Sequence, residues 1–269
     1  MSDSPTKILQ GVDAIIDSHF FSDEKLRGYS YCQKRSCNAL SKNSPKSFDG
    51  AALVAAIYAR IEHNLANRPT EKRPTPSAQN WRLRLTDDEQ LIRPSSGNTS
   101  AEVKLERAIV QKWQASWTYQ MPIASGLFDG HSDKRRAVDL VFDHGDGHYD
   151  LVELKIKSDT PLYAAMEILG YGLVYLASRR DRAVNLKYAT ADLPVLTANR
   201  ITLCVLAPEG YYAGSDLMWL QVAIHDGLKR FATPELSMDF RFETFDSQWC
   251  HELPPKNLPE TLVRNPVWQ

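Results

Sequence analysis

Residues 136–157 read RAVDLVFDHGDGHYDLVELKIK and carry the clearest structural signal in the chain. Two runs rich in Val, Leu and Ile flank a Gly-Asp-Gly turn, a pattern typical of two strands joined as a hairpin. In the second run, period-two alternation places Glu153 and Lys155 on one face of the strand and apolar side chains on the other. Asp139 lies in the first run. The stretch therefore predicts a hairpin that brings two carboxylates and an ammonium group together.

This set of groups has a specific chemistry. An ionised carboxylate such as that of Asp139 is costly in an apolar run unless it is paired or binds a cation. Two carboxylates with a main-chain carbonyl between them, here that of Leu154, are hard oxygen ligands that suit Mg²⁺. A lysine beside them can orient or deprotonate an attacking water, or neutralise charge that develops on a phosphate. The simpler alternative is a solvated cross-strand ion pair that has no catalytic role.

The flanking sequence predicts a mixed α/β sheet flanked by helices. A helix is expected from about residue 98–100, where Asn, Thr or Ser can cap it, to about Trp117. Strands are expected at 117–124, 136–142 and 149–156, and a second helix follows, capped by Ser158, Asp159 or Thr160. A buried strand at 201–206, a helix at 217–231 and an alternating strand at 238–245 complete the order.

The N-terminal part is expected to be helical. Helices are predicted at 8–20 and at 50–65, with Asp49 as the N-cap of the second one. The polar, basic segment 31–47 between them is predicted to be a loop. Residues 67–80 contain three prolines and few apolar side chains, which is typical of a linker. We therefore divide the chain into a helical region with its linker, residues 1–80, and an α/β domain, residues 81–269.

Asp139 followed by Glu153-Leu154-Lys155 resembles the PD-(D/E)xK motif of the restriction-endonuclease-like nuclease superfamily, with Val138 in place of the proline. The resemblance covers about residues 100–206. It implies a core of helix, three-stranded meander, helix and strand, which is the order expected above. It also implies that Asp139, Glu153 and the carbonyl of Leu154 bind Mg²⁺ or Mn²⁺, and that Lys155 is catalytic.

The two flanking helices offer further candidates. Glu106 falls within the apolar arc of the first helix, where a glutamate is unexpected unless it faces a metal. The resemblance implies a metal-site glutamate on this helix, with Glu102 as the second choice, although Glu106 tilted to solvent and paired with a base is the alternative. In the following helix, Glu167 and Tyr171 resemble a Gln-x-x-x-Tyr pair with glutamate in place of glutamine. An aromatic packing stripe explains that pair equally well.

Basic residues around the motif are candidates for binding backbone phosphate, although solvated loop ends are the alternative. They are Lys134, Arg135, Arg136, Lys157, Arg179 and Arg180. Three histidines near the motif receive no role, since a histidine beside a turn is more often structural. They are His131, His144 and His148.

Composition limits the class of protein. The chain has 269 residues, 32 Lys and Arg against 33 Asp and Glu, and so is not a highly basic nucleic-acid coat. No apolar run approaches the roughly 18 to 20 residues that span a bilayer. The first 20 residues lack signal-peptide features, so a cytoplasmic protein is expected. Cys32, Cys37, Cys204 and Cys250 are expected as free thiols, because paired CxxC spacing is missing; zinc binding with His251 is the alternative.

The leading hypothesis is therefore a Mg²⁺-dependent nuclease that acts on DNA and is expected to cut as an endonuclease. Genome defence or repair is expected only by analogy with the superfamily. Expected partners are DNA and either a second copy or a larger nuclease or defence complex, with no membrane association. One rival hypothesis is a catalytically inactive nuclease-fold subunit for binding or assembly. Another is a soluble α/β protein in which the E-x-K residues form a surface ion pair.

Overall fold

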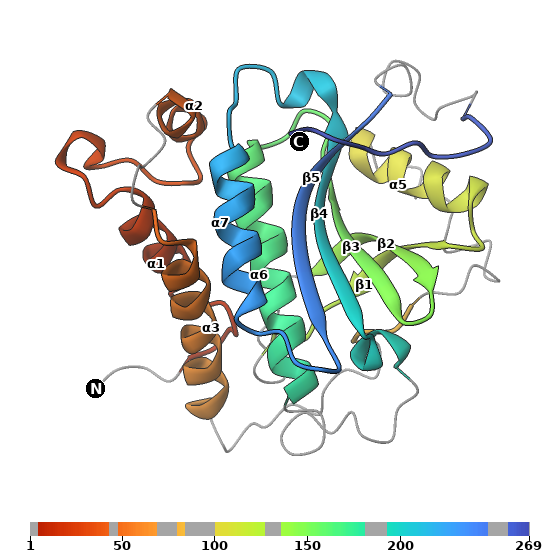
Figure 1. The fold of residues 1–269 in the computed structure, drawn as a ribbon, viewed down its shortest axis with the longest axis horizontal. Helices are drawn as coiled ribbons and strands as arrows, with labels where there is room; N and C mark the ends of the chain where they lie inside the picture. The colour runs from red at the N-terminus through yellow and green to blue at the C-terminus, as the bar shows by residue number, and fades with distance from the viewer. Residues whose placement is uncertain are drawn as a thin grey trace.

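The computed structural model describes residues 5–42, 48–68, 80–83, 100–126, 136–180, 193–246 and 258–268. This part of the chain is a mixed α/β protein built on a six-stranded sheet with the spatial order β1-β2-β3-β4-β5-β6 (Figure 1). The strands are β1 (Trp117–Pro122), β2 (Ala137–Gly145), β3 (His148–Leu154), β4 (Arg200–Pro208), β5 (Ser237–Phe245) and β6 (Asn265–Pro266). The first three form an antiparallel meander, β3, β4 and β5 run parallel, and β6 is antiparallel to β5.

Helices cover both faces of the sheet. The order α5 (Ala101–Lys112), β1, β2, β3, α6 (Pro161–Arg180), β4, α7 (Met218–Lys229), β5 is the order of elements predicted from the sequence. Helix α5 packs on one face, where its apolar residues join side chains of β1 to β5 in one core cluster. Helices α6 and α7 lie on the other face, within a larger core cluster. Short 3-10 helices lie at Glu24–Leu26, Pro194–Thr197 and Glu209–Tyr211.

Helix α6 is the central helix of the larger core. Sixteen of its twenty residues are buried, as expected for a helix with neighbours on all sides. Thr160 starts the helix, since its Oγ1 accepts a hydrogen bond from the N–H of Tyr163 at 3.2 Å. Across the part of the chain that the structure describes, no helix has both the length and the apolarity needed to cross a membrane.

The N-terminal helices share the larger core with the sheet. They are α1 (Val12–Phe20), α2 (Lys34–Lys42) and α3 (Gly50–Ala66), and α3 packs against α1, α6 and α7. As predicted, Asp49 caps α3 by accepting a hydrogen bond from the N–H of Ala52 at 2.9 Å. The predicted proline-rich linker lies largely outside the described residues, because 69–79 are not among them.

Two predictions about these elements are wrong. The sequence predicts a loop at 31–47, yet this segment contains α2. Its polar composition reflects an exposed helix face, whereas Ser36, Cys37 and Leu40 form a narrow buried face. The helix expected to reach Trp117 ends at Lys112, because Trp117 already begins β1.

Candidate metal centre

Three polar side chains face one another across the meander. The pairs Tyr119–Leu140 and Leu140–Val152 set the register. One step further along, Gln120 lies across from Asp139, and Asp139 lies across from Glu153. Directly opposed residues of antiparallel strands project from the same face of a sheet. The register therefore brings these three side chains close together, and they connect to Glu106 of α5 and, through Lys155, to Glu167 of α6.

Hydrogen bonds fix the orientation of Asp139. Its Oδ2 accepts a hydrogen bond from the N–H of Leu154 at 3.0 Å. The side-chain amide of Gln120 donates to Asp139 Oδ1 at 3.4 Å and to Glu106 Oε2 at 2.9 Å. Gln120 adopts a left-handed backbone conformation with φ of 51°, which is rare for a residue other than glycine. Such conformations cost energy and often occur at functional sites.

The structure distinguishes the two glutamates of α5. Glu106 is 2% exposed and shares the Gln120 amide with Asp139. Glu102 has a different role, because its Oε1 accepts hydrogen bonds from the N–H of Ile156 at 3.0 Å and from the Ser158 hydroxyl at 2.6 Å. The carboxylate beside Asp139 is thus that of Glu106, while Glu102 holds the turn that follows β3.

Lys155 lies at the centre of the acidic residues. Its Nζ is 2.8 Å from Glu153 Oε1 and 3.4 Å from Glu167 Oε2, and its side chain is 8% exposed. The Asp159 carboxylate is 3.7 Å away on the solvent side. The hydroxyl of Tyr171 donates to Glu167 Oε1 at 3.0 Å. The Glu167–Tyr171 pair of α6 is therefore part of the same cluster, and it is more than an aromatic packing stripe.

The cluster contains more negative than positive charge. Burial raises the pKa of Asp139 to about 6, although Lys155 and the Leu154 N–H pull it down. Burial and the nearby Asp139 raise the pKa values of Glu106 and Glu153 well above their ordinary range. Burial alone would lower the pKa of Lys155, but Glu153 and Glu167 hold it above its ordinary value. Lys155 is therefore an ammonium group.

The donor set fits a divalent cation. Glu153 and Glu167 contact the ammonium of Lys155, and Asp139 lies close enough to affect its pKa. Glu106 lies beside Asp139 and near Arg107, so four carboxylates share two basic groups. Buried charge of one sign is costly without a counter-ion. Glu153 Oε2 is buried and has no hydrogen-bond partner among the described residues. An oxygen of this kind is suited to bind a hard cation. The carbonyl of Leu154 faces the strand of Asp139, because its N–H does so.

The predicted basic residues are scattered. Burial raises the pKa values of Tyr163 and Tyr171, and Arg136 lies close enough to oppose that rise, so it borders the cluster. Lys157 is exposed just beyond β3. Lys134, Arg135 and His131 lie outside the described residues.

Arg179 and Arg180 are not brought to the site. They lie at the end of α6, about 18 Å along the helix axis from Glu167 at 1.5 Å per residue. Arg179 donates to the carbonyl oxygens of Ala198 and Glu235, and Arg180 to the hydroxyl of Tyr58. Both arginines hydrogen-bond α6 to neighbouring segments. Their positive charge alone does not predict this role.

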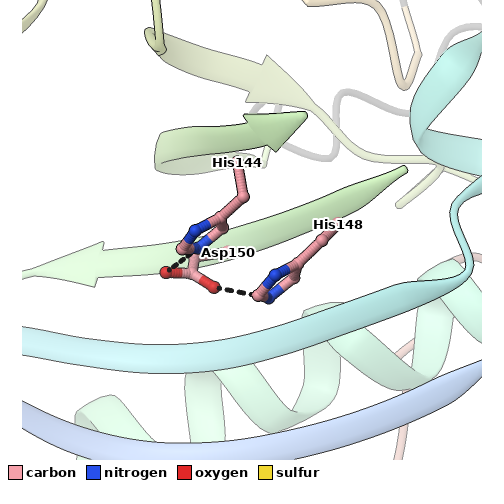
Figure 2. Close-up of side chains that lie close together, drawn as sticks. All are labelled: His144, His148 and Asp150. Atoms are coloured by element: carbon pink, nitrogen blue, oxygen red, sulfur yellow. Dashed lines mark ion pairs between the residues drawn. The ribbon is translucent and has the colours of Figure 1, made fainter. Parts of the chain in front are cut away.

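A second polar cluster lies on the opposite face of the sheet, around Asp150 (Figure 2). His144 Nε2 lies 3.0 Å from Asp150 Oδ2, and His148 Nε2 lies 3.3 Å from Asp150 Oδ1. Asp150 is fully buried and also pairs with Arg241 and Arg264. Burial alone would raise the pKa of Asp150, but the two guanidinium groups hold it below its usual value.

The ligand atoms of His144, His148 and Asp150 are close enough together to be considered as a metal site. Two features oppose that role. The imidazole rings are stacked, with centroids 3.9 Å and planes 4° apart, so their in-plane lone pairs do not converge on one point. Arg241 and Arg264 already supply positive charge to Asp150. The arrangement therefore suits a hydrogen-bonded ion-pair network better than a cation site.

That network fastens the C-terminal segment 258–268 to the sheet. Arg264 pairs with Asp150 and with Glu243, whose Oε2 lies 2.6 Å from Arg264 Nε. Its guanidinium also lies 5.5 Å from the ring centroids of Trp117 and Phe142. The sequence alone indicated no role for Asp150, Arg264 or Gln120. A buried aspartate within an apolar strand was the available signal for Asp150.

The predicted free thiols agree with the structure where it describes them. Cys32, Cys37 and Cys204 are free, the first exposed and the others buried. Cys250 and His251 lie outside the described residues, so zinc binding by that set stays a hypothesis.

Comparisons with protein-family models, with curated proteins and with solved structures found no match to this chain.

Proposed function

We propose that this protein is a divalent-metal-dependent nuclease that hydrolyses phosphodiester bonds in DNA, with Mg²⁺ or Mn²⁺ as its cation. The observation that carries the proposal is the cluster in which Glu153 pairs with Lys155 while Glu106 and Asp139 share the side-chain amide of Gln120. Their charge balance and the unpartnered Glu153 Oε2 suit a hard cation. Such a cation would polarise the scissile phosphate and lower the pKa of a bound water.

The architecture supports the same proposal. The elements α5, β1, β2, β3, α6 and β4 follow one another as the PD-(D/E)xK resemblance implies, with Asp139 on the second strand and Glu153 and Lys155 at the end of the third. We therefore propose a restriction-endonuclease-like core. Cleavage within the strand, and a role in genome defence or repair, rest on analogy with that superfamily.

Each residue has a chemical role in this proposal. Asp139, Glu153 and the Leu154 carbonyl hold the cation, and Glu106 completes the site directly or through water. The Lys155 ammonium donates hydrogen bonds to a phosphate oxygen or to the attacking water, because its raised pKa keeps it protonated. Glu167, fixed by Tyr171, positions Lys155.

The test is incubation of the full chain with plasmid, linear duplex, single-stranded DNA and RNA in Mg²⁺, Mn²⁺ or EDTA. We expect DNA cleavage with either metal and none in EDTA. Lys155→Ala should lower the rate by about 100-fold or more, as loss of a donor to a transition state does. Lys229→Ala, on the exposed end of α7, is the matched control and should leave the rate unchanged.

Activity that survives both EDTA and Lys155→Ala would overturn the proposed chemistry. Nucleic-acid binding by a folded chain that cleaves none of the four substrates would instead favour the rival hypothesis of an inactive binding or assembly subunit.

A further inference from the structure

Helix α2 presents a basic face to solvent. At about 100° per residue, Lys34, Arg35 and Lys42 fall on one side of the helix with Asn38 between them, and all four are exposed. The opposite side carries the buried residues. Between residues 31 and 48 the chain has four Lys or Arg and no Asp or Glu. This is a local concentration of positive charge in a chain whose formal net charge is −1.

Contacts place α2 beside the candidate metal centre. Tyr31, three residues before α2, stacks on Tyr163 in the first turn of α6, with ring centroids 5.7 Å and planes 8° apart. Tyr163 is one helical turn from Glu167, so the two share a helix face. Tyr31 is held in turn by α1, where its hydroxyl donates to Asp13 at 2.5 Å and its N–H donates to Asp17 at 2.8 Å.

A second connection passes through the loop after β4. Cys37 Sγ on the buried face of α2 lies 3.6 Å from the Ser215 hydroxyl. Tyr211, in the same loop, lies close enough to Cys37 and to Lys155 for each to affect its pKa. Its buried hydroxyl has no hydrogen-bond partner among the described residues. Figure 1 accordingly shows α2 at the end of the molecule where α6 begins.

The ammonium groups of Lys34 and Lys42 are unpaired within the part of the chain that the structure describes. Neither forms an ion pair or a side-chain hydrogen bond with any residue that the structure describes, whereas Arg35 donates to Gln33 and to the carbonyl of Gly28. Unpaired lysines beside the proposed nuclease centre complement the negative charge of a nucleic-acid backbone. Eight residues of helix rise about 12 Å, which corresponds to three or four nucleotides at about 3.4 Å each.

We propose that the exposed face of α2 is part of the substrate-binding surface and that Lys34 and Lys42 bind the phosphate backbone of duplex DNA beside the scissile phosphate. The inference rests on the proposed nuclease function and adds to it the surface that holds the substrate. Such contacts are independent of base sequence, since they reach only phosphate.

The test measures binding of a labelled DNA duplex by fluorescence anisotropy across a range of salt concentrations, with Ca²⁺ neutralising the acidic cluster. The variant is Lys34→Gln with Lys42→Gln. The matched control is Lys229→Gln with Arg230→Gln, which removes the same charge at the far end of α7. Each lost phosphate contact lowers the slope of log Kobs against log salt by about 0.9, so the α2 variant should lose nearly two.

We expect affinity at moderate salt to fall by about tenfold or more in the α2 variant and to stay unchanged in the control. Wild-type binding with an unchanged slope in the folded α2 variant would overturn this inference and leave the nuclease proposal standing. Preference for RNA over duplex DNA would overturn the choice of substrate. Failure of the wild-type protein to bind any nucleic acid would overturn the nuclease proposal as well.

Discussion

Lys155 Nζ lies 2.8 Å from Oε1 of Glu153, two residues earlier in the chain, and both side chains are almost fully buried. Alternation along a strand places these groups on one face, but a buried ion pair with further carboxylates around it is more than alternation predicts. The pair therefore has consequences for stability that can be measured apart from any activity.

Removal of the lysine should destabilise the metal-free protein. Lys155→Ala leaves Glu153 and its acidic neighbours without their ammonium, and loss of one partner of a buried pair costs about 3 kcal/mol. Urea denaturation in EDTA measures the free energy of unfolding. Glu153→Gln in the same background should recover part of the loss, and an unchanged stability in Lys155→Ala would contradict the buried pair.

Mg²⁺ should stabilise the wild-type protein through the acidic cluster. A ligand at about 100 times its Kd adds about 2.7 kcal/mol to the free energy of unfolding, which raises Tm. Asp139→Asn removes a charged ligand and should abolish most of that rise, whereas Asp143→Asn, on the exposed end of β2, should not. Equal Mg²⁺-induced shifts of Tm in the two variants would place the cation elsewhere.

Gln120 should matter for activity more than for stability. Gln120→Asn keeps a residue that tolerates a left-handed backbone, but its shorter amide cannot hold both Glu106 and Asp139. Loss of a group that orients metal ligands costs roughly 10- to 100-fold in metal affinity or activity. Chemical denaturation should find the stability within about 1 kcal/mol of wild type. A fully active variant would contradict this role.

The histidine pair should make stability depend on pH. Burial, with the neighbouring His144 and arginines, lowers the pKa of His148 below the ordinary value of about 6.5. The unfolded chain therefore takes up the proton first, and the folded state loses stability as pH falls below about 6.5, by up to about 1.4 kcal/mol per pH unit. His148→Gln should show a shallower decline, which paired denaturation curves at several pH values would measure.

The close packing of α3 on α7 can be tested at a glycine. A Cβ at Gly50 would lie 2.3 Å from the carbonyl oxygen of Ala223, so Gly50→Ala should cost about 1 to 3 kcal/mol. Gly210→Ala is the control, because a Cβ there meets no atom within 4 Å. Equal thermal stability of the two variants would show that the helices separate readily.

Much of this fold could be predicted, because its elements have strong local signals. The hairpin turn, the alternation at Glu153 and Lys155, and the apolar run of β4 each identify an element without tertiary information. Helix α2 could not be recognised in this way, because its buried face is narrow and polar residues on an exposed face look like a loop.

The composition of the candidate site was harder to predict. In the sequence, Gln120 is simply a polar residue in the alternating pattern of β1. Its contact with two carboxylates becomes apparent only from its left-handed backbone and from its position beside Asp139 in the structure. The apolar arc of α5 already favoured Glu106 over Glu102, but the sequence could not show that Glu102 instead accepts hydrogen bonds from the turn after β3. Roles of this kind depend on contacts between segments far apart in the chain.

The short strand β6 also affects the tendency of the protein to associate with further copies of itself. An unpaired outer strand invites another chain to add to the sheet, and aggregation often starts there. Beside Glu243 and Thr244 of β5, that outer position is taken by Asn265 and Pro266. A proline has no N–H to offer to a further strand. The segment held by Arg264 thus shields this end of the β5 edge against intermolecular strand pairing.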